Sequence, residues 1–149
     1  VGVAFVLLPP VPGLGVHGAT RWVDDRPLIQ LSLRGKSDDQ LWFTLFHEIG
    51  HVLLHGDKSV FLNTNSDSTE EEADNFAATT LVPAAFRDRL PRTRDLEAIQ
   101  TLAKELGIAP SIVLGQAQRI TGDFKWGHSL KRKFEWAARS NLEKPPNAN

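Results

Sequence analysis

Residues 47–51 read HEIGH, and this pentapeptide carries the residue types that a zinc hydrolase needs. On a helix, His47 and His51 project from one face on successive turns, so that both imidazoles reach a single Zn²⁺. Glu48, next to the first histidine, reaches the water on that metal. The expected chemistry is hydrolysis at one catalytic zinc, with Glu48 as the general base for the attacking water.

The surroundings of the pentapeptide strengthen this interpretation. The neighbouring residues are mostly apolar, where unpaired imidazoles and a carboxylate are costly, and a bound metal removes that cost. A catalytic zinc takes three protein ligands and leaves one position for water. A carboxylate-rich segment follows, and its candidates for the third ligand are Glu70, Glu71, Glu72 and Asp74. The alternative for this run is an acidic first turn that favours the helix dipole.

The chain has no cysteine, so a transition metal must use histidine and carboxylate ligands, and a thiol nucleophile is excluded. In a straight helix His55 lies about 12 Å along the axis from His47, too far for both to bind one ion, and we expect a structural role for it. The residue ten positions after His47 is Asp57, which excludes the metzincin arrangement.

Hydrolysis of a carbonyl group at zinc would also need a donor for the oxyanion. Because the chain has no tyrosine, that donor must be the metal, a histidine, an arginine, a side-chain amide or a backbone N–H. His128 and His17 are the histidines free for this role, and His128 is our candidate oxyanion donor.

Two helices are expected to carry the site. Apolar and histidine side chains recur at helical spacing over residues 40–55. The serine and two aspartates at residues 37–39, directly before this segment, are typical N-cap residues. A second helix is expected over residues 70–81, capped by Ser68 or Thr69, because each has a glutamate three residues further on.

Strands are expected mainly before these helices. Residues 2–8 are apolar and β-branched and predict a fully buried strand. Residues 21–23 and 28–33 flank the turn-forming cluster at 24–27 and predict a β-hairpin. A further short strand is expected over residues 59–62.

The expected fold class is α+β, with a small, mostly antiparallel sheet packed on the HEIGH helix and its glutamate-bearing neighbour, followed by C-terminal helices. With 149 residues, 41 % of them apolar, the chain has material for one domain, expected over residues 1–140, with a polar tail at 141–149. The chain has no methionine, even at position 1, so we expect a domain excised from a longer protein.

The overall charge is balanced, with 17 Lys+Arg against 18 Asp+Glu, but the second half is basic. There, two helices expected over residues 95–106 and 110–120 have the outline of a helix-turn-helix. The second of them offers only Arg119 as a basic residue, so a packed helical hairpin is preferred and direct DNA binding is not expected. The apolar start of the chain is too short to span a membrane, and no membrane partner is expected.

Residues 43–83 contain two motifs that together resemble those of a known protein family. FTLFHEIGHVLLH followed by EEEADNFAATTLVP resembles the ImmA/IrrE family of zinc metallopeptidases, whose pattern is a similar HExxH helix followed by E-x-x-A-[ND]-x-F-A-A-x-x-L-x-P. Flanking segments are similar more loosely, and the resemblance covers most of the chain to about Trp136.

The resemblance also implies roles for single residues. Glu48 would be the general base. Glu72 is the alternative third ligand, because the triple glutamate leaves the register open by two residues. Asp74 would not bind the metal itself but would hydrogen-bond to one of the ligating histidines, His47 or His51. The metal ligands implied are His47, His51 and Glu70.

Characterised members of the family are regulatory proteases that cut Xre-type helix-turn-helix repressors and so induce stress genes, and many have such a domain fused or encoded alongside. The resemblance therefore implies a cytoplasmic zinc endopeptidase in transcription regulation and stress response. Its partners would be a repressor substrate and a fused or adjacent DNA-binding domain. The alternative is a non-catalytic zinc-bearing sensor or DNA-binding module.

Overall fold

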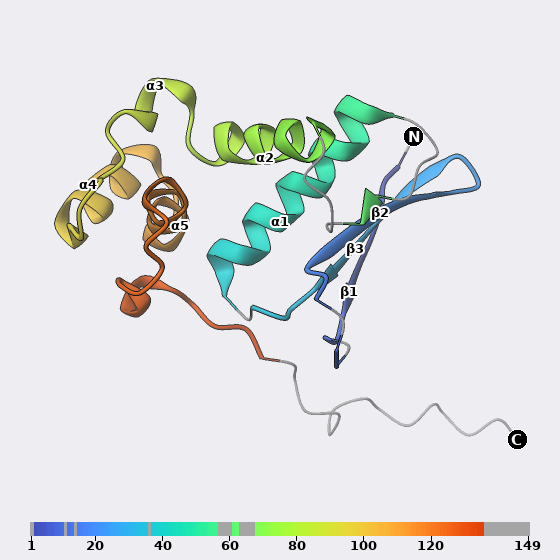
Figure 1. The fold of residues 1–149 in the computed structure, drawn as a ribbon, viewed down its shortest axis with the longest axis horizontal. Helices are drawn as coiled ribbons and strands as arrows, with labels where there is room; N and C mark the ends of the chain where they lie inside the picture. Colours follow the sequence, from blue (N-terminus) through green and yellow to red (C-terminus); the bar gives the residue numbers. More distant parts are fainter. Residues whose placement is uncertain are drawn as a thin grey trace, which may run out of the picture.

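The structure, a computed structural model, describes residues 2–135 except residues 11, 14, 36, 57–60 and 63–67. Figure 1 shows a sheet at one end, α1 beside it, and further helices at the other end. The strands are β1 (Ala4–Leu8), β2 (Gly18–Val23), β3 (Arg26–Ser32) and β4 (Phe61–Leu62). The helices are α1 (Asp38–Gly50), the π-helical turn η1 (His51–His55), α2 (Ser68–Leu81), α3 (Ala84–Arg87), α4 (Leu96–Leu106), α5 (Pro110–Thr121) and the 3-10 turn η2 (His128–Leu130).

The described strands form one sheet in the order β1-β3-β2-β4. β1 pairs with β3 in parallel, whereas the β2–β3 and β2–β4 pairings are antiparallel. α1 lies against β2 and β3, and the β3 residues Ile29 and Leu31 are buried. The predicted α+β class, with a mostly antiparallel sheet on the HEIGH helix, is confirmed.

β2 and β3 form the predicted hairpin. Asp24 and Asp25 make its turn with positive φ angles of 48° and 60°. Two successive left-handed residues give a turn whose twist matches that of the strands, and aspartate tolerates this conformation. The second strand begins at Arg26, earlier than expected, because the turn needs only the two aspartates and Pro27 already pairs with Trp22.

β1 is a strand as predicted, but the prediction that it is fully buried is wrong. Val3, Phe5 and Leu8 are 51 %, 48 % and 37 % exposed. β1 lies at one edge of the sheet, and α1 lies against β2 and β3 instead. An apolar run predicts a strand, but which strands a helix covers is decided by the tertiary arrangement.

The helix predicted over residues 40–55 is present with two differences. α1 begins earlier, at Asp38, and its last turn continues as the π-helical η1 up to Gly56, whose φ of 37° ends the helix. Ser37 occupies the expected N-cap position without a capping hydrogen bond from its side chain. Instead, the buried carboxylate of Asp38 accepts from the backbone N–H of Asp39.

The second predicted helix is α2, which begins at Ser68, so Ser68 and Thr69 lie inside the helix rather than at its cap. The strand expected over residues 59–62 is observed at residues 61–62 as β4. Residues 59 and 60 of the expected strand lie outside the described part of the chain. The expected tail at 141–149 also lies outside the described residues.

α4 and α5 confirm the two C-terminal helices, and α3 was not predicted. Seven of the twelve α5 residues are buried, among them Ile112, Val113 and Leu114. A helix covered to this extent cannot present those residues to a DNA groove, which favours the packed hairpin over a helix-turn-helix. Among the described residues, no helix combines the length and apolar character needed to cross a membrane. The core around this hairpin consists of Val82, Leu90, Ile99, Leu102, Ala103, Val113, Leu114, Ala117 and Trp126.

Candidate metal centre

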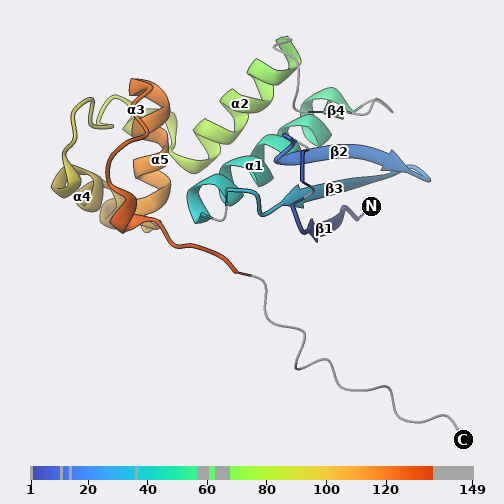
Figure 2. The same ribbon diagram turned by 60° about the horizontal axis from the view of Figure 1, so that its bottom comes forward.

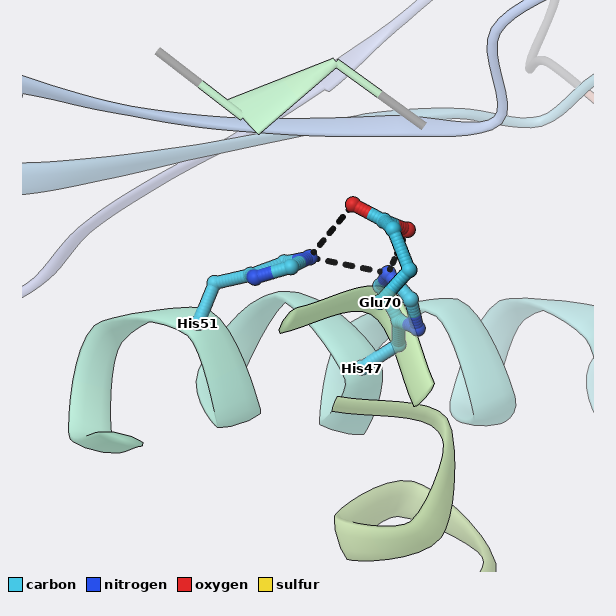
Figure 3. A group of neighbouring side chains, drawn as sticks. All are labelled: His47, His51 and Glu70. Atoms are coloured by element: carbon cyan, nitrogen blue, oxygen red, sulfur yellow. Dashed lines mark hydrogen bonds and ion pairs between the residues drawn. The ribbon is translucent and has the colours of Figure 1, made fainter. Parts of the chain in front are cut away.

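Two histidines from the HEIGH segment and one glutamate from α2 point toward one another (Figure 3). The Nε2 atoms of His47 and His51 are 3.1 Å apart. Oε2 of Glu70 lies 3.2 Å from Nε2 of His47, and Oε1 of Glu70 lies 3.2 Å from Nε2 of His51. One ligand atom from each residue lies within 4.8 Å of the others, and both histidines are only 2 % exposed. The structure thus brings together the three residues expected as ligands.

The close crossing of α1 and α2 explains why Glu70 reaches the histidines, and Figure 2 shows the two helices side by side. A Cβ added at Gly50 would lie 3.1 Å from Cα of Ala73, and Ala73 and Ala77 are fully buried. Small residues at the crossing let the backbones approach. Since Glu70 precedes Ala73 by one helical turn, the close approach places its carboxylate beside the imidazoles.

Hydrogen bonds orient the outer nitrogen of each imidazole. Oδ1 of Asp74 lies 2.8 Å from Nδ1 of His47. Because an ionised carboxylate only accepts, Nδ1 carries a hydrogen, and Nε2 has its lone pair available when the ring is neutral. His51 lies 3.3 Å from His55 between their Nδ1 atoms, and Nε2 of His55 lies 3.0 Å from Oε2 of Glu72. The same rule makes His55 donate to Glu72 and accept from His51.

With the hydrogens on these outer nitrogens, two imidazole lone pairs and a carboxylate face one another. Acceptors that converge without a donor between them are held together by a cation. Two imidazoles and a carboxylate are also a donor set found at catalytic zinc. The residues of the cluster, His47, His51 and Glu70, therefore fit a metal cofactor.

The electrostatics differ between the two histidines. Burial lowers the pKa of His51 to about 4, and the charges of His47 and His55 add to this lowering, so the ring stays neutral. Burial also acts to lower the pKa of His47, but the hydrogen bond to Asp74 and the nearby carboxylates outweigh it and raise that pKa. The surroundings of His47 favour positive charge, and the same preference attracts a metal ion.

Asp74 connects His47 to α5. Nη2 of Arg119 donates to Oδ2 of Asp74 at 2.7 Å, and the guanidinium lies 3.8 Å from the ring centroid of Phe43. Burial acts to raise the pKa of Asp74, but the hydrogen bond from His47 and the charge of Arg119 outweigh it, so this pKa is lowered. Sequence reasoning named Arg119 only as a basic residue of its helix and did not assign it to the site, because it lies 45 residues from Asp74 in the chain.

Glu72, the alternative third ligand, lies apart from the cluster. Its side chain is 62 % exposed, and its Oε2 accepts a hydrogen bond from Nε2 of His55. Among the described residues, the group that could hold a metal ion contains Glu70 and not Glu72. His55, for which a structural role was expected, extends the hydrogen-bond chain outward from His51. The straight-helix argument addressed only direct ligation, so it gave no sign of this contact.

Glu48 lies beside β2 and is 1 % exposed. Thr20 donates from Oγ1 to Oε2 of Glu48 at 2.6 Å, and a Cβ added at Gly18 would lie 2.5 Å from Oε1. Burial raises the pKa of Glu48 to about 7, although the Thr20 hydrogen bond and the charge of His47 oppose the rise. Sequence reasoning missed Gly18 and Thr20. The available signal was that these inward positions of β2 hold small or polar residues.

A cavity of about 280 Å³ lies beside His47, and both His17 and Arg119 line it. Burial lowers the pKa of His17, and the charge of Arg34 adds to the lowering. His128, the candidate oxyanion donor, is exposed on η2 and is not among the residues that line this cavity. Of these two histidines, His17 lines the same cavity as His47, and His128 does not.

A family model described as IrrE N-terminal-like domain, Peptidase_M78, matches residues 7–115. The match includes the three residues of the cluster together with Glu48 and Asp74, and it confirms the resemblance to the ImmA/IrrE family. No curated protein matched the chain. The family supports a metallopeptidase-like role in general. The matched region spans well over half of the 149 residues, and the chain belongs to the IrrE N-terminal-like family of peptidases, Peptidase_M78.

Proposed function

We propose that the chain is a zinc-dependent endopeptidase in which His47, His51 and Glu70 hold the metal and Glu48 is the general base. The observation that carries the proposal is the convergence of two imidazole nitrogens and a carboxylate within 4.8 Å, on histidines that are buried. Membership of a peptidase family supports hydrolysis of a peptide bond rather than another use of the metal.

When bound, zinc supplies a Lewis acid that lowers the pKa of a water molecule toward 7. Glu48 has a pKa of about 7 in its buried position, so it can take a proton near neutral pH and release it again. The hydrogen bond from Thr20 fixes the direction of its carboxylate. In the proposed reaction Glu48 accepts a proton from the attacking water and delivers it to the departing amine.

A donor is also needed where negative charge develops on the scissile carbonyl oxygen. His17 and Arg119 both line the cavity beside His47, which supports them over the exposed His128. A neutral His17 still has one ring N–H to donate. Arg119 is held in place by Asp74 on one side and the ring of Phe43 on the other.

The substrate we propose is a helix-turn-helix repressor of the Xre type, cut in the cytoplasm as part of a stress response. Support for this comes from the resemblance to the ImmA/IrrE family, whose characterised members are regulatory proteases. The same resemblance supports a fused or adjacent DNA-binding domain as a partner.

The experiment compares the zinc-loaded chain with its Glu48→Gln variant. Zinc is counted by elemental analysis, and a mixed peptide library is followed by mass spectrometry for new termini. We expect about one zinc in both proteins, and a loss of roughly 10²- to 10⁴-fold in cleavage for Glu48→Gln, because general-base catalysis contributes about that much. Failure of the parent chain to retain zinc would contradict the proposal. Zinc retention without cleavage would instead favour the non-catalytic sensor.

A further inference from the structure

The cavity beside His47 is bounded mainly by α1, by α5 and by the segment that follows α5, with His17 and Asp74 also in its lining. Its volume is about 280 Å³, close to the lower end of the roughly 300–1,000 Å³ of small-ligand pockets. That size suits one large side chain rather than a folded segment. We call it the His47 pocket and define it by Phe43, His47, Ile112, Arg119 and Phe124.

Three apolar side chains contribute walls to the His47 pocket. They come from different elements: Phe43 from α1, Ile112 from α5, and Phe124 from the segment after α5. Phe124 is 54 % exposed, so more than half of this apolar residue is open to water. A group that filled the pocket would take apolar surface of these residues out of water, and such burial is favourable.

The charged groups in the wall are already paired. Nζ of Lys131 donates to Oδ2 of Asp39 at 2.7 Å, and Arg119 donates to Asp74 at the same distance. Lys131 donates in addition to Oε1 of Gln118 at 2.8 Å. Each acid in the lining thus has its own cation, although Oδ1 of Asp39 is buried without a hydrogen-bond partner among the described residues. A charged side chain entering the pocket would lose hydration without finding an unpaired charge to replace it.

The position of the pocket relates it to the proposed reaction. His47 lines the pocket and also belongs to the candidate metal cluster. A peptide held with its scissile bond at that cluster would place a neighbouring side chain at the pocket's mouth.

We propose that the His47 pocket receives a large, uncharged side chain of the peptide substrate, next to the scissile bond, and so sets the enzyme's sequence preference. The inference rests on the proposed function, because it takes the histidine cluster as the place of hydrolysis.

The test uses binding rather than turnover. The Glu48→Gln chain, loaded with zinc, is titrated calorimetrically with hydroxamates, whose chelating group occupies the metal. The probes are the hydroxamates of phenylalanine, leucine, alanine, glutamate and lysine, with acetohydroxamate as the probe that lacks an amino-acid side chain. We expect the phenylalanine probe to bind about 10-fold more tightly than the alanine probe, because its ring is buried. The glutamate and lysine probes should bind no more tightly than the alanine probe.

Two variants localise the effect. Phe124→Ala removes an exposed ring from the pocket wall, so the ratio between the phenylalanine and alanine probes should fall several-fold. Leu96→Ala is the matched control, since Leu96 is 40 % exposed on α4 and does not line the pocket. It should leave the ratio unchanged.

The outcomes separate the two proposals. Equal affinities for the phenylalanine and alanine probes, or a ratio that Phe124→Ala leaves unchanged, would overturn the pocket assignment while acetohydroxamate still binds. A preference for the glutamate or lysine probe would overturn it as well. If acetohydroxamate and every other probe fail to bind, the metal site itself is wrong, and the proposed function falls together with the pocket.

Discussion

Each histidine of the cluster is held by a carboxylate beyond it, but the two arrangements differ. His47 reaches its carboxylate, Asp74, directly, whereas His51 reaches Glu72 through the ring of His55. Such outer partners fix the orientation of an imidazole and raise its affinity for a metal. Glu72, which the sequence leaves open as a ligand, is thus placed to act on the metal only through two rings.

This difference predicts graded effects within the acidic first turn of α2. Glu70→Ala should abolish zinc retention, because it removes a ligand, whereas Glu72→Ala should weaken zinc binding by about 10-fold through His55 and His51. Glu71→Ala is the control, since Glu71 is exposed in the same turn. Competition with a calibrated zinc chelator measures the three affinities. Complete loss of zinc in Glu72→Ala would instead identify Glu72 as a ligand.

Gly18 has a specific role beside Glu48. A Cβ at this position would lie 2.5 Å from Oε1 of Glu48 and 2.6 Å from Cγ2 of Thr44, and Glu48 is only 1 % exposed. We expect Gly18→Ala to lower the free energy of unfolding by about 1–3 kcal/mol through overpacking. Urea denaturation measures this change.

Gly2→Ala is the control for Gly18→Ala, because an added Cβ at Gly2 meets nothing within 4 Å. It should change the free energy of unfolding by less than about 0.5 kcal/mol. Equal stability of the two variants would show that β2 moves away from Glu48 without cost.

Among the elements, the start of α1 is held by tertiary contacts rather than by its cap. The buried carboxylate of Asp38 accepts from Oγ of Ser111 at 2.7 Å and from the backbone N–H of Arg132 at 3.0 Å. It thereby joins α1 to α5 and to the segment after η2. The expected cap, Ser37, makes no capping hydrogen bond with its side chain.

Asp38→Ala and Ser37→Ala should therefore have unequal effects. Asp38→Ala leaves a hydroxyl and two backbone N–H groups without their acceptor, and we expect a loss of about 2–4 kcal/mol in the free energy of unfolding. Ser37→Ala should cost less than about 0.5 kcal/mol, below the ~1 kcal/mol of a working N-cap. Thermal and urea unfolding of both variants measure the difference. A larger loss in Ser37→Ala would restore the capping interpretation.

At the scale of the whole molecule, sequence patterns predict elements better than the contacts between them. The helices α1, α2, α4 and α5 follow from periodicity, glycine and proline. Burial of β1 does not follow, because an edge strand and a central strand can have the same apolar sequence. The π-helical form of η1 likewise has no signal in the spacing of His51 and His55.

The residues of the candidate site likewise fall into those that a sequence pattern predicts and those that depend on tertiary packing. His47, His51 and Glu70 could be predicted, because a metal imposes fixed spacings on a helix and a carboxylate on the next one. Thr20 and Arg119 could not, since they come from a strand and a helix far from the motif in the chain. Their roles depend on how the sheet and α5 pack around α1, and a single sequence does not encode that packing in a local pattern.

The metal should couple the halves of the molecule. His47 and His51 belong to the segment on the sheet, and Glu70 belongs to α2, so a bound ion links two elements that otherwise meet through packing at Gly50 and Ala73. A ligand that binds only the folded chain raises its stability, by about 4 kcal/mol at a thousand times its dissociation constant. Removing zinc with a chelator should therefore lower the melting temperature.

The zinc-dependent change in melting temperature should require the Glu70 carboxylate. Calorimetric scans with added zinc and with chelator should give melting temperatures several degrees apart for the parent chain and for Glu48→Gln, since 1 kcal/mol corresponds to roughly 2–4 °C in larger domains and more in small ones. Glu70→Ala should melt at the same temperature in both conditions. If Glu70→Ala kept the full zinc-dependent shift, the ion would bind elsewhere, and the cluster between α1 and α2 would not be the metal centre.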